Sequence, residues 1–240
     1  MLDINNRIMD NQKRSLTPRS VIQLLLFIIV IPFLPLLISL SWDWWEAWVY
    51  GFINILGYVI SRAMAAKRNP DLITERAQFM KHENVFNWDK ILAPLVGFGG
   101  GLITLVVGLD KLLNWSPAYS ILVKIIALAF ILIGFIWGSY ALIQNRFFSG
   151  MVRIQNDRGH HVITSGPYRW MRHPGYTGAI LTFLATPLFL DSAWASIPAV
   201  FLVIMLVLRT SLEDKVLQVE LEGYSEYAEK VRYRLFPGVW

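Results

Sequence analysis

The chain reads Gly166-Pro167-Tyr168-Arg169-Trp170-Met171-Arg172-His173-Pro174-Gly175-Tyr176 where a polar, cationic segment runs directly into an apolar one. The Arg-His-Pro tripeptide at 172–174 predicts a helix start, because proline tolerates the first helical position, where its missing N–H costs nothing. The free N–H groups and the positive end of the helix dipole would favour an anion there. The segment therefore predicts a binding site at the polar end of an apolar helix.

The composition is that of an integral membrane protein. Of the 240 residues, 55% are hydrophobic and 16% are charged, whereas soluble domains carry about 25% charged residues. The net charge of +5 is spread over short segments between apolar runs, which suits anionic lipid headgroups and shows no aromatic-interleaved basic patch for nucleic acid. With no cysteine, a disulfide framework, a thiolate nucleophile and a cysteine metal site are all excluded.

The apolar runs predict an all-α fold with about six transmembrane helices. The first run is longer than the ~7–15 residues of a signal-peptide core, so no cleavable signal peptide is expected. The last two runs would span only ~22–24 Å as helices, which predicts a short helical hairpin turning at Asp191-Ser192. The six predicted spans are 21–40, 45–66, 91–109, 121–143, 176–190 and 193–208.

The distribution of lysine and arginine predicts which side of the membrane each segment occupies. With six crossings and a cytoplasmic N-terminus, twenty of the twenty-two basic residues lie in cytoplasmic segments, and only Lys111 and Lys124 lie outside. The positive-inside rule therefore places both termini, both long polar loops and the candidate site in the cytoplasm. A re-entrant hairpin would give the same sidedness, so the charges leave open whether the last hairpin crosses the bilayer.

No stretch is long enough to form a separate soluble domain, so the chain is expected to form a single membrane domain with two regions. Residues 1–144 form an N-terminal region of four spans, and residues 145–240 form a core with the hairpin and a C-terminal tail. From Arg209 the last span is expected to continue as a cytoplasmic helix with an incomplete apolar stripe. Gly223 should break that helix before a further turn from Tyr224 to Val231.

The hairpin would bring residues 172–176 next to Arg209 and Glu213, which are four apart and share a helical face. Cationic groups and helix N–H donors suit a carboxylate, acidic groups suit an ammonium or a ribose, and aromatic rings suit a flat base or a sulfonium. S-adenosylmethionine carries all of these groups. A nicotinamide dinucleotide fits less well, because no G-x-G-x-x-G motif follows a predicted strand.

Each of these residues also has a structural interpretation. Arg172 could contact lipid headgroups from a span end, and Glu213-Asp214 could be a solvated helix face. The tyrosines could belong to an interfacial aromatic belt. His160-His161 could bind metal, although adjacent helical residues do not share a face. The charged segment from Arg62 to Lys90 is expected to be a salt-bridged loop. The convergence of several such groups on one side of one hairpin favours a site.

The ordered combination of motifs resembles the isoprenylcysteine carboxyl methyltransferase family, whose core is shared by phospholipid methyltransferases. It comprises the segments 160–168 and 172–178, then Arg209 with Glu213-Asp214, then Tyr224 and Tyr227, and the resemblance covers about 145–240. The segments 69–76 and 88–90 are similar to the upstream loop of bacterial relatives. The resemblance implies a substrate-side role for Arg209, with Arg172 as a further catalytic candidate. It implies S-adenosylmethionine contacts from Gln155, His160, His161, Val162, Ile163, Tyr168, His173, Pro174, Gly175, Tyr176 and Glu213, and no metal site.

The resemblance implies methyl transfer to a lipophilic or prenylated substrate, most like carboxyl O-methylation of an isoprenylcysteine. A carboxylate nucleophile needs no base, whereas an amine or hydroxyl would need one, for which His161 and His173 are candidates. Three alternatives remain open: a phospholipid or amine N-methyltransferase, an NADPH-dependent enzyme similar to sterol reductases, and a membrane scaffold without catalysis. Membrane lipids are expected contacts, and the sequence does not determine an oligomeric state.

Overall fold

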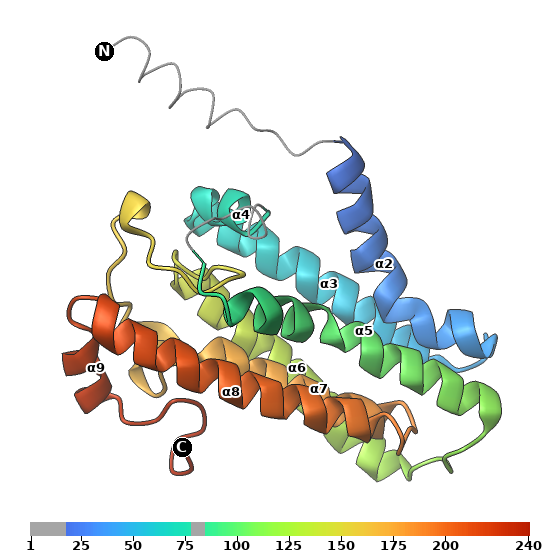
Figure 1. Ribbon diagram of the computed structural model, residues 1–240. Coiled ribbons are helices and arrows are strands. Elements are labelled where there is room, and N and C mark those ends of the chain that lie inside the picture. The colour runs from blue at the N-terminus through green and yellow to red at the C-terminus, as the bar shows by residue number, and fades with distance from the viewer. Residues whose placement is uncertain (1–17, 78–84) are drawn as a thin grey trace.

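The computed structural model describes residues 18–77 and 85–240, and within them it contains eight α-helices and no strand (Figure 1). The predicted all-α fold is confirmed for this part of the chain. Two short 3-10 turns lie between α6 and α7, at Asn156–Arg158 and Gly166–Arg169. The helices are α2 (Pro18–Ser39), α3 (Trp45–Arg68), α4 (Pro70–Ala77), α5 (Asp89–Leu113), α6 (Ile121–Gln144), α7 (Pro174–Phe189), α8 (Ser196–Glu220) and α9 (Tyr224–Lys230).

Four of the described helices are long and apolar enough to cross a membrane: α3, α5, α6 and α8. They coincide with four of the six predicted spans, and they support an integral membrane protein. That α2 and the 16-residue α7 also cross stays a prediction. Arg7, Lys13 and Arg14, which contribute to the predicted sidedness of the N-terminus, lie outside the described residues.

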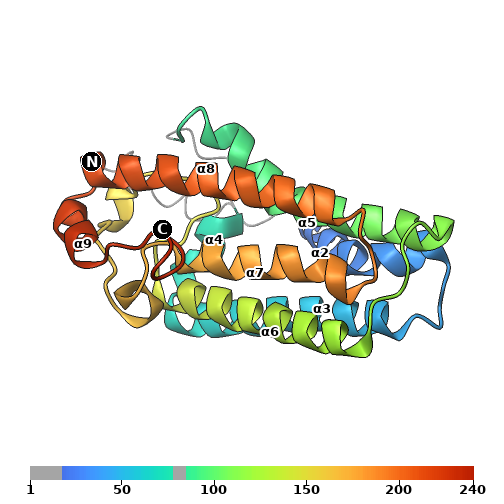
Figure 2. The same cartoon turned by 90° about the horizontal axis from the view of Figure 1, so that it is seen from below.

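The long helices run side by side and place their polar connections at one end of the bundle (Figures 1 and 2). We call this the polar end, and define it as residues 69–77, 85–88, 145–173 and 221–240. The other end carries the connections 40–44, 114–120 and 190–195. There, buried Lys124 pairs with Glu46 and, at 2.6 Å, with Asp191, which ties α3, α6 and the α7–α8 connection together.

The predicted helical hairpin is formed by α7 and α8, which pack against each other. α7 begins at Pro174 with His173 as its N-cap residue, as the Arg-His-Pro motif predicts. α8 continues past the end of the predicted span through Arg209 to Glu220. Gly223 has a φ of 78°, a left-handed conformation that suits glycine, and α9 follows it at once. The predicted helix break is therefore confirmed.

The expectation of a loop from Arg62 to Lys90 is wrong for residues 62–77. α3 extends to Arg68, and α4 begins at Pro70 after the single non-helical residue Asn69. The Asn-Pro pair ends one helix and begins the next, because proline disfavours helical backbone in the residue before it but suits a first helical position. The expected ion pairs exist, but Asp71 and Glu75 pair with arginines of segment 145–158.

The closest helix contact in the bundle joins α6 and α7 and depends on glycine. A Cβ atom on Gly178 would lie 2.5 Å from the carbonyl oxygen of Gly134 and 2.8 Å from the amide nitrogen of Gly138. Both atoms belong to the backbone, so no rotamer change can relieve the overlap. Segment 145–173 follows directly after the end of α6. The contact between α6 and α7 therefore fixes where α7 begins relative to this segment.

Replacing Gly178 with alanine is expected to lower the free energy of unfolding in detergent by about 1–3 kcal/mol, because α6 and α7 must separate. Gly97→Ala is the matched control, since a Cβ atom there meets nothing within 4 Å. We expect the control to leave stability unchanged or to raise it, as alanine is the better helix former. Equal thermal unfolding midpoints for the two variants would contradict the packing argument.

Candidate active site

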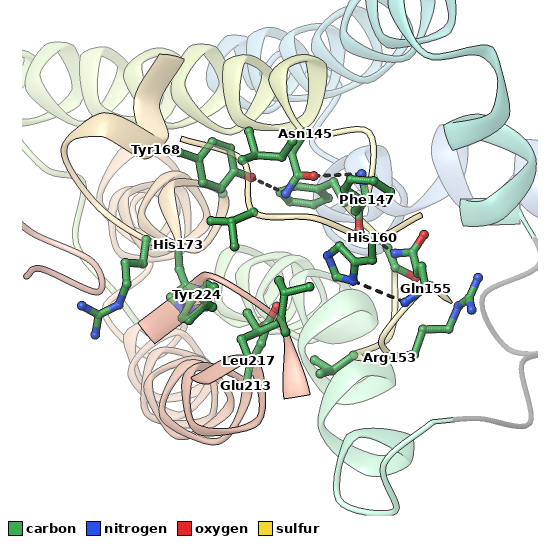
Figure 3. A pocket seen from close by; sticks show the side chains of 18 of the residues that line it. Asn145, Phe147, Arg153, Gln155, His160, Tyr168, His173, Glu213, Leu217 and Tyr224 are labelled. Atoms are coloured by element: carbon green, nitrogen blue, oxygen red, sulfur yellow. Dashed lines mark hydrogen bonds between the residues drawn. The ribbon is translucent and has the colours of Figure 1, made fainter. Parts of the chain in front are cut away.

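A pocket at the polar end is enclosed by segment 145–173, the first turn of α7, the second half of α8 and α9 (Figure 3). Of the thirteen predicted site residues, Pro174 alone is not among its lining residues; it is buried at the start of α7. The twelve that line the pocket are Gln155, His160, His161, Val162, Ile163, Tyr168, Arg172, His173, Gly175, Tyr176, Arg209 and Glu213. The structure thus brings these residues together, while their individual roles stay predictions.

The two helices of the hairpin meet in this pocket through Glu213 and Tyr176. The Tyr176 hydroxyl donates a hydrogen bond of 2.5 Å to Glu213 Oε2. The Arg209 guanidinium carbon lies 5.3 Å from the centroid of the Tyr176 ring. The Glu213 carboxylate is half-buried and accepts from a neutral hydroxyl rather than from a cation, so its negative charge is available to a ligand.

Asp214, the next residue, has the opposite environment. Its side chain is fully buried and accepts hydrogen bonds from Arg172 at 2.7 and 2.9 Å and from Arg234 at 2.8 Å. Gln218 and Tyr224 donate to it as well, at 2.8 and 3.0 Å, and His173 Nε2 lies 3.3 Å away. Asp214 therefore joins the start of α7 to α8, α9 and the C-terminal segment.

Arg172 is held in the wall of the pocket. Its Nε and Nη2 donate to Asp214. Its Nη1 donates to the carbonyl oxygens of Val231 and Arg232 at 2.7 and 3.0 Å. The side chain is 6% exposed. These contacts support a positioning role for Arg172 more than a direct contact with a reacting group.

Arg209 is paired with Asp89 at the start of α5. Its Nε and Nη2 donate to the two carboxylate oxygens at 2.7 and 3.1 Å, and Nη2 also donates to the Gly150 carbonyl at 3.0 Å. Asp89 is fully buried and accepts the Val152 amide at 2.5 Å. The pair therefore fixes the Arg209 guanidinium and anchors segment 145–173 from the N-terminal half of the chain.

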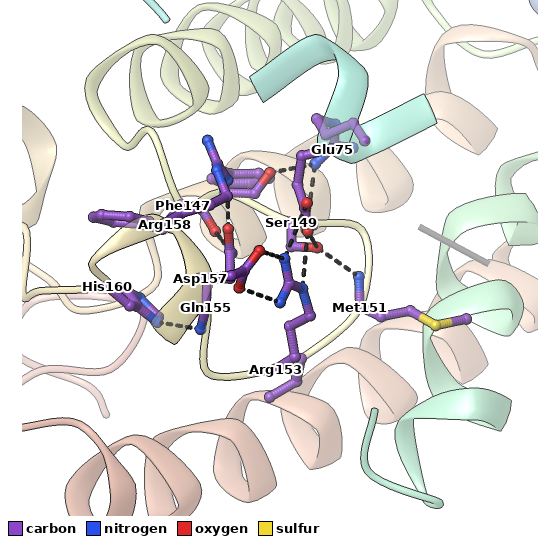
Figure 4. A network of polar contacts seen from close by, with 12 residues as sticks. Glu75, Phe147, Ser149, Met151, Arg153, Gln155, Asp157, Arg158 and His160 are labelled. Carbon is purple, nitrogen blue, oxygen red and sulfur yellow. Dashed lines mark hydrogen bonds and ion pairs between the residues drawn. The ribbon is translucent and has the colours of Figure 1, made fainter. Parts of the chain in front are cut away.

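A second ion-pair network holds segment 145–173 against α4 (Figure 4). Arg153 donates to both carboxylate oxygens of Glu75 at 3.0 Å and to Asp157 at 2.9 Å. The hydrogen bond from Arg153 lowers the pKa of Asp157. Arg158 pairs with Asp71 and donates to Gln155 Oε1. The segment is therefore fixed at several points although it contains only short 3-10 turns.

His160 faces the pocket in its neutral form. Its Nδ1 accepts the Gln155 amide at 3.3 Å, and its ring lies 4.6 Å from that of Phe147. Burial, with the nearby charges of His161, Arg153 and Arg158, lowers the pKa of His160 to about 4. At neutral pH the ring is thus an uncharged, flat group suited to stacking. His161 is exposed, with its ring 4.9 Å from the same phenylalanine.

Tyr168, Tyr224 and Tyr227 complete the wall formed by segment 145–173 and α9. Tyr168 accepts from Asn145 Nδ2 at 3.2 Å, and its carbonyl oxygen accepts the Tyr227 hydroxyl at 2.7 Å. Burial raises the pKa of Tyr168 and of Tyr227 above the ordinary value. These hydroxyls therefore stay protonated and act as neutral donors.

Several lining residues were not among the predicted site residues. Phe147 and Arg153 come from the start of segment 145–173, and Leu217 follows Glu213 by one helical turn. The spacing of Leu217 from Glu213 could have placed it on the same face. Nothing in the sequence pairs Asp89 with Arg209, which is 120 residues away. Within the described residues, histidine and carboxylate side chains form no group of three or more that could hold a metal ion.

Comparison with known proteins finds a family match that includes this part of the chain. The sequence profile of the isoprenylcysteine carboxyl methyltransferase (ICMT) family matches residues 122–219. This region contains α6, segment 145–173, α7 and nearly all of α8. This part of the chain is therefore similar to the ICMT family.

Individual relatives match less than half of the chain. Two rice proteins, from Oryza sativa subspecies indica and japonica, are named probable protein-S-isoprenylcysteine O-methyltransferase and are 28% identical over 112 residues. The match covers 45% of this chain and 59% of each rice protein, so the chain spans about three-fifths of their length. The uncharacterized protein YpbQ of Bacillus subtilis is 36% identical over 61 residues, which is 25% of this chain and 36% of that protein.

Proposed function

We propose that this protein is an integral membrane methyltransferase that uses S-adenosylmethionine to O-methylate the carboxylate of a lipophilic substrate, most like a prenylated cysteine. The observation that carries the proposal is the pocket between α7 and α8, where twelve predicted site residues converge inside the region matched by the ICMT family. The names of the rice relatives give the substrate class.

The residues present fit the proposed methyl donor. Glu213 offers a carboxylate that forms no ion pair within residues 18–77 and 85–240, suited to an α-ammonium group. The uncharged His160 ring beside Phe147 offers a flat surface for a base. The open volume of about 100 Å³ is below the ~300–1,000 Å³ usual for ligand pockets, so binding requires lining side chains to move. When bound, S-adenosylmethionine supplies a methyl group already activated by its sulfonium.

Arg209 is the proposed contact for the substrate carboxylate. Asp89 occupies its Nε and Nη2, and within the described residues its Nη1 has no acceptor. A guanidinium held in this way can orient a carboxylate without having to be ordered first. Orientation of reacting groups and exclusion of water can remove ~7–11 kcal/mol of a reaction barrier.

The histidines favour a carboxylate over an amine as methyl acceptor. An amine needs a base to take its proton, and His173 is the more deeply placed of the two candidates. It is buried, and its Nε2 lies 3.3 Å from Asp214 and 3.5 Å from the Tyr224 hydroxyl. His161 is exposed. A carboxylate acceptor needs neither residue.

The proposed orientation has six crossings, with both termini and the pocket on the cytoplasmic side. It is supported by the gathering of the polar segments at one end of the bundle, which contain nine lysine and arginine residues, whereas the connections 40–44, 114–120 and 190–195 at the other end contain none. The soluble methyl donor would then enter from the cytoplasm, and the lipophilic substrate would enter laterally between helices.

The test is calorimetric titration of the detergent-solubilised protein with S-adenosylhomocysteine, with NADPH in a parallel titration. We expect saturable binding of S-adenosylhomocysteine and none of NADPH. A labelled-methyl assay then compares N-acetyl-S-farnesylcysteine with phosphatidylethanolamine vesicles, and we expect label in the farnesylcysteine alone. Tight NADPH binding without S-adenosylhomocysteine binding would favour a reductase, and no binding of either would favour a scaffold.

A further inference from the structure

A second cavity lies within the bundle, between α2, α3, α5, α6 and α7, with a volume of about 400 Å³. This is in the range of pockets that bind small molecules, ~300–1,000 Å³. Its lining is mainly apolar, and Gly175 lines both this cavity and the pocket at the polar end. The two spaces therefore adjoin at the first turn of α7, where Arg209 and Tyr176 also lie.

Glycines create this cavity. A Cβ atom on Gly100 would meet its first neighbour, Phe183, at 3.9 Å, and one on Gly138 would meet the Gly175 carbonyl oxygen at 3.9 Å. Both positions therefore leave free space where other residues would place a side chain. A cavity with this lining, within helices proposed to span a membrane, suits a hydrocarbon chain.

One cation lines the cavity, Arg62 on α3. Its guanidinium stacks on the Tyr58 ring at 4.4 Å and donates to Ser61 Oγ at 3.1 Å. Within the described part of the chain, no carboxylate pairs with it, in contrast to Lys124, Arg153, Arg172 and Arg209. A half-buried arginine without a counter-ion is costly unless an anion binds beside it.

Two further arginines, Arg76 and Arg209, add to the positive charge of Arg62. Arg76 on α4 lies near both Arg62 and Arg209 and donates to the carbonyl oxygens of Phe148 and Ser149 at 3.0 and 3.3 Å. Burial, with the charges of Arg62 and Arg209, lowers the pKa of Arg76 to about 9, so it stays charged at pH 7. The Asp89 and Glu213 carboxylates both act on Arg209, and within the described residues no ion pair joins a carboxylate to Arg62 or Arg76. The region where the cavities adjoin therefore carries excess positive charge.

We propose that Arg62 binds the anionic headgroup of an amphiphile whose hydrocarbon tail occupies the α2–α3–α5–α6–α7 cavity, and that this amphiphile is the carboxylate-bearing methyl acceptor. The second part rests on the proposed function. Arg62 would select the charged acid, and the methyl ester product would lose this contact. Arg209, already neutralised by Asp89, would orient the carboxylate at the adjoining pocket. Arg62 lies outside the region matched by the ICMT family.

The test measures binding without any cofactor, in a neutral detergent. The probes are N-acetyl-S-farnesylcysteine, its methyl ester as the uncharged match, and dodecyl phosphate as a phosphate headgroup. Wild-type protein is expected to bind the acid on the order of tenfold more tightly than the ester, the effect of one charge-assisted hydrogen bond. Arg62→Gln should bring that ratio to about one, and Arg62→Lys should retain part of it. Arg68→Gln, an exposed arginine on the same helix, should leave the ratio unchanged.

A second variant tests the tail separately. Gly100→Leu fills free space in the cavity and should weaken the acid and the ester equally, with their ratio preserved. Equal affinity for acid and ester in wild-type protein, or an unchanged ratio in Arg62→Gln, would overturn the proposal. Stronger binding of dodecyl phosphate than of the acid would assign the headgroup site to phospholipid and overturn its link to the methyl acceptor.

S-Adenosylhomocysteine titration of the same variants separates this inference from the proposed function. Arg62→Gln should bind S-adenosylhomocysteine like the wild type, which also shows that the variant is folded. If wild-type protein fails to bind S-adenosylhomocysteine but prefers the acid, the proposed function fails and the anionic headgroup site stands. If it binds S-adenosylhomocysteine without preferring the acid, the headgroup site fails alone.

Discussion

Replacing Asp214 with alanine is expected to lower the free energy of unfolding by about 3–5 kcal/mol, the cost of breaking a buried ion pair from one side. The substitution leaves the Arg172 guanidinium, which is 6% exposed, without its carboxylate. It also removes the acceptor of Tyr224, Gln218 and Arg234. The start of α7 would then lose the carboxylate that joins it to α8 and α9. Thermal or denaturant unfolding in detergent, followed by circular dichroism, measures the effect.

Asp157→Ala is the matched control for this prediction. Asp157 also pairs with an arginine, at 2.9 Å, but its side chain is 62% exposed. A pair of this kind contributes about 0–1 kcal/mol, because water and salt screen it. Similar losses in the two variants would show that burial of the Asp214 carboxylate does not determine its contribution.

Glu213→Ala is expected to weaken binding of S-adenosylhomocysteine by roughly 10- to 150-fold with little effect on folding. The estimate is the ~1.5–3 kcal/mol of a hydrogen bond to a charged group, here the ligand's ammonium. Among the residues that the structure describes, Glu213 accepts from the Tyr176 hydroxyl alone, so its removal leaves one neutral donor without a partner. Calorimetric titration with S-adenosylhomocysteine measures the affinity, and the unfolding midpoint shows whether the fold is intact.

Glu220→Ala provides the comparison, since Glu220 is exposed at the end of the same helix. It should retain wild-type affinity for S-adenosylhomocysteine. If Glu213→Ala binds as tightly as Glu220→Ala, Glu213 does not contact the ligand. If instead Glu213→Ala unfolds like Asp214→Ala, its role is structural.

The adjacent residues Glu213 and Asp214 show where sequence reasoning reaches its limit. The Arg209-to-Glu213 spacing correctly predicted that these residues share a face, because the helical period fixes their relative direction. The same period places Asp214 about 100° around the helix, but the sequence does not say which direction is buried. The packing of α8 against α7 and α9 decides this. It leaves Glu213 in the pocket and buries Asp214 completely.

The helices were predictable to the extent that local signals define them. Runs of apolar residues predicted the four long apolar helices, the Arg-His-Pro motif predicted the start of α7, and Gly223 predicted the break between α8 and α9. The short helix α4 was missed because half of its eight residues are polar and no long apolar run distinguishes them from a loop. Its position against segment 145–158 depends on ion pairs between residues more than 70 apart in the chain.

The pairing of Asp89 with Arg209 shows that residues outside the region matched by the ICMT family hold its arginines in place. Residues 122–219 contain Arg209, yet its counter-ion belongs to α5, and Glu75, which holds Arg153, belongs to α4. Consider a chimeric protein whose residues before 122 come from one relative and whose later residues come from another. It could keep the whole region that the family matches and still bury Arg209 or Arg153 without a carboxylate at position 89 or 75. We expect such chimeras to fold only when Asp89 and Glu75 are transferred together with Arg209 and Arg153.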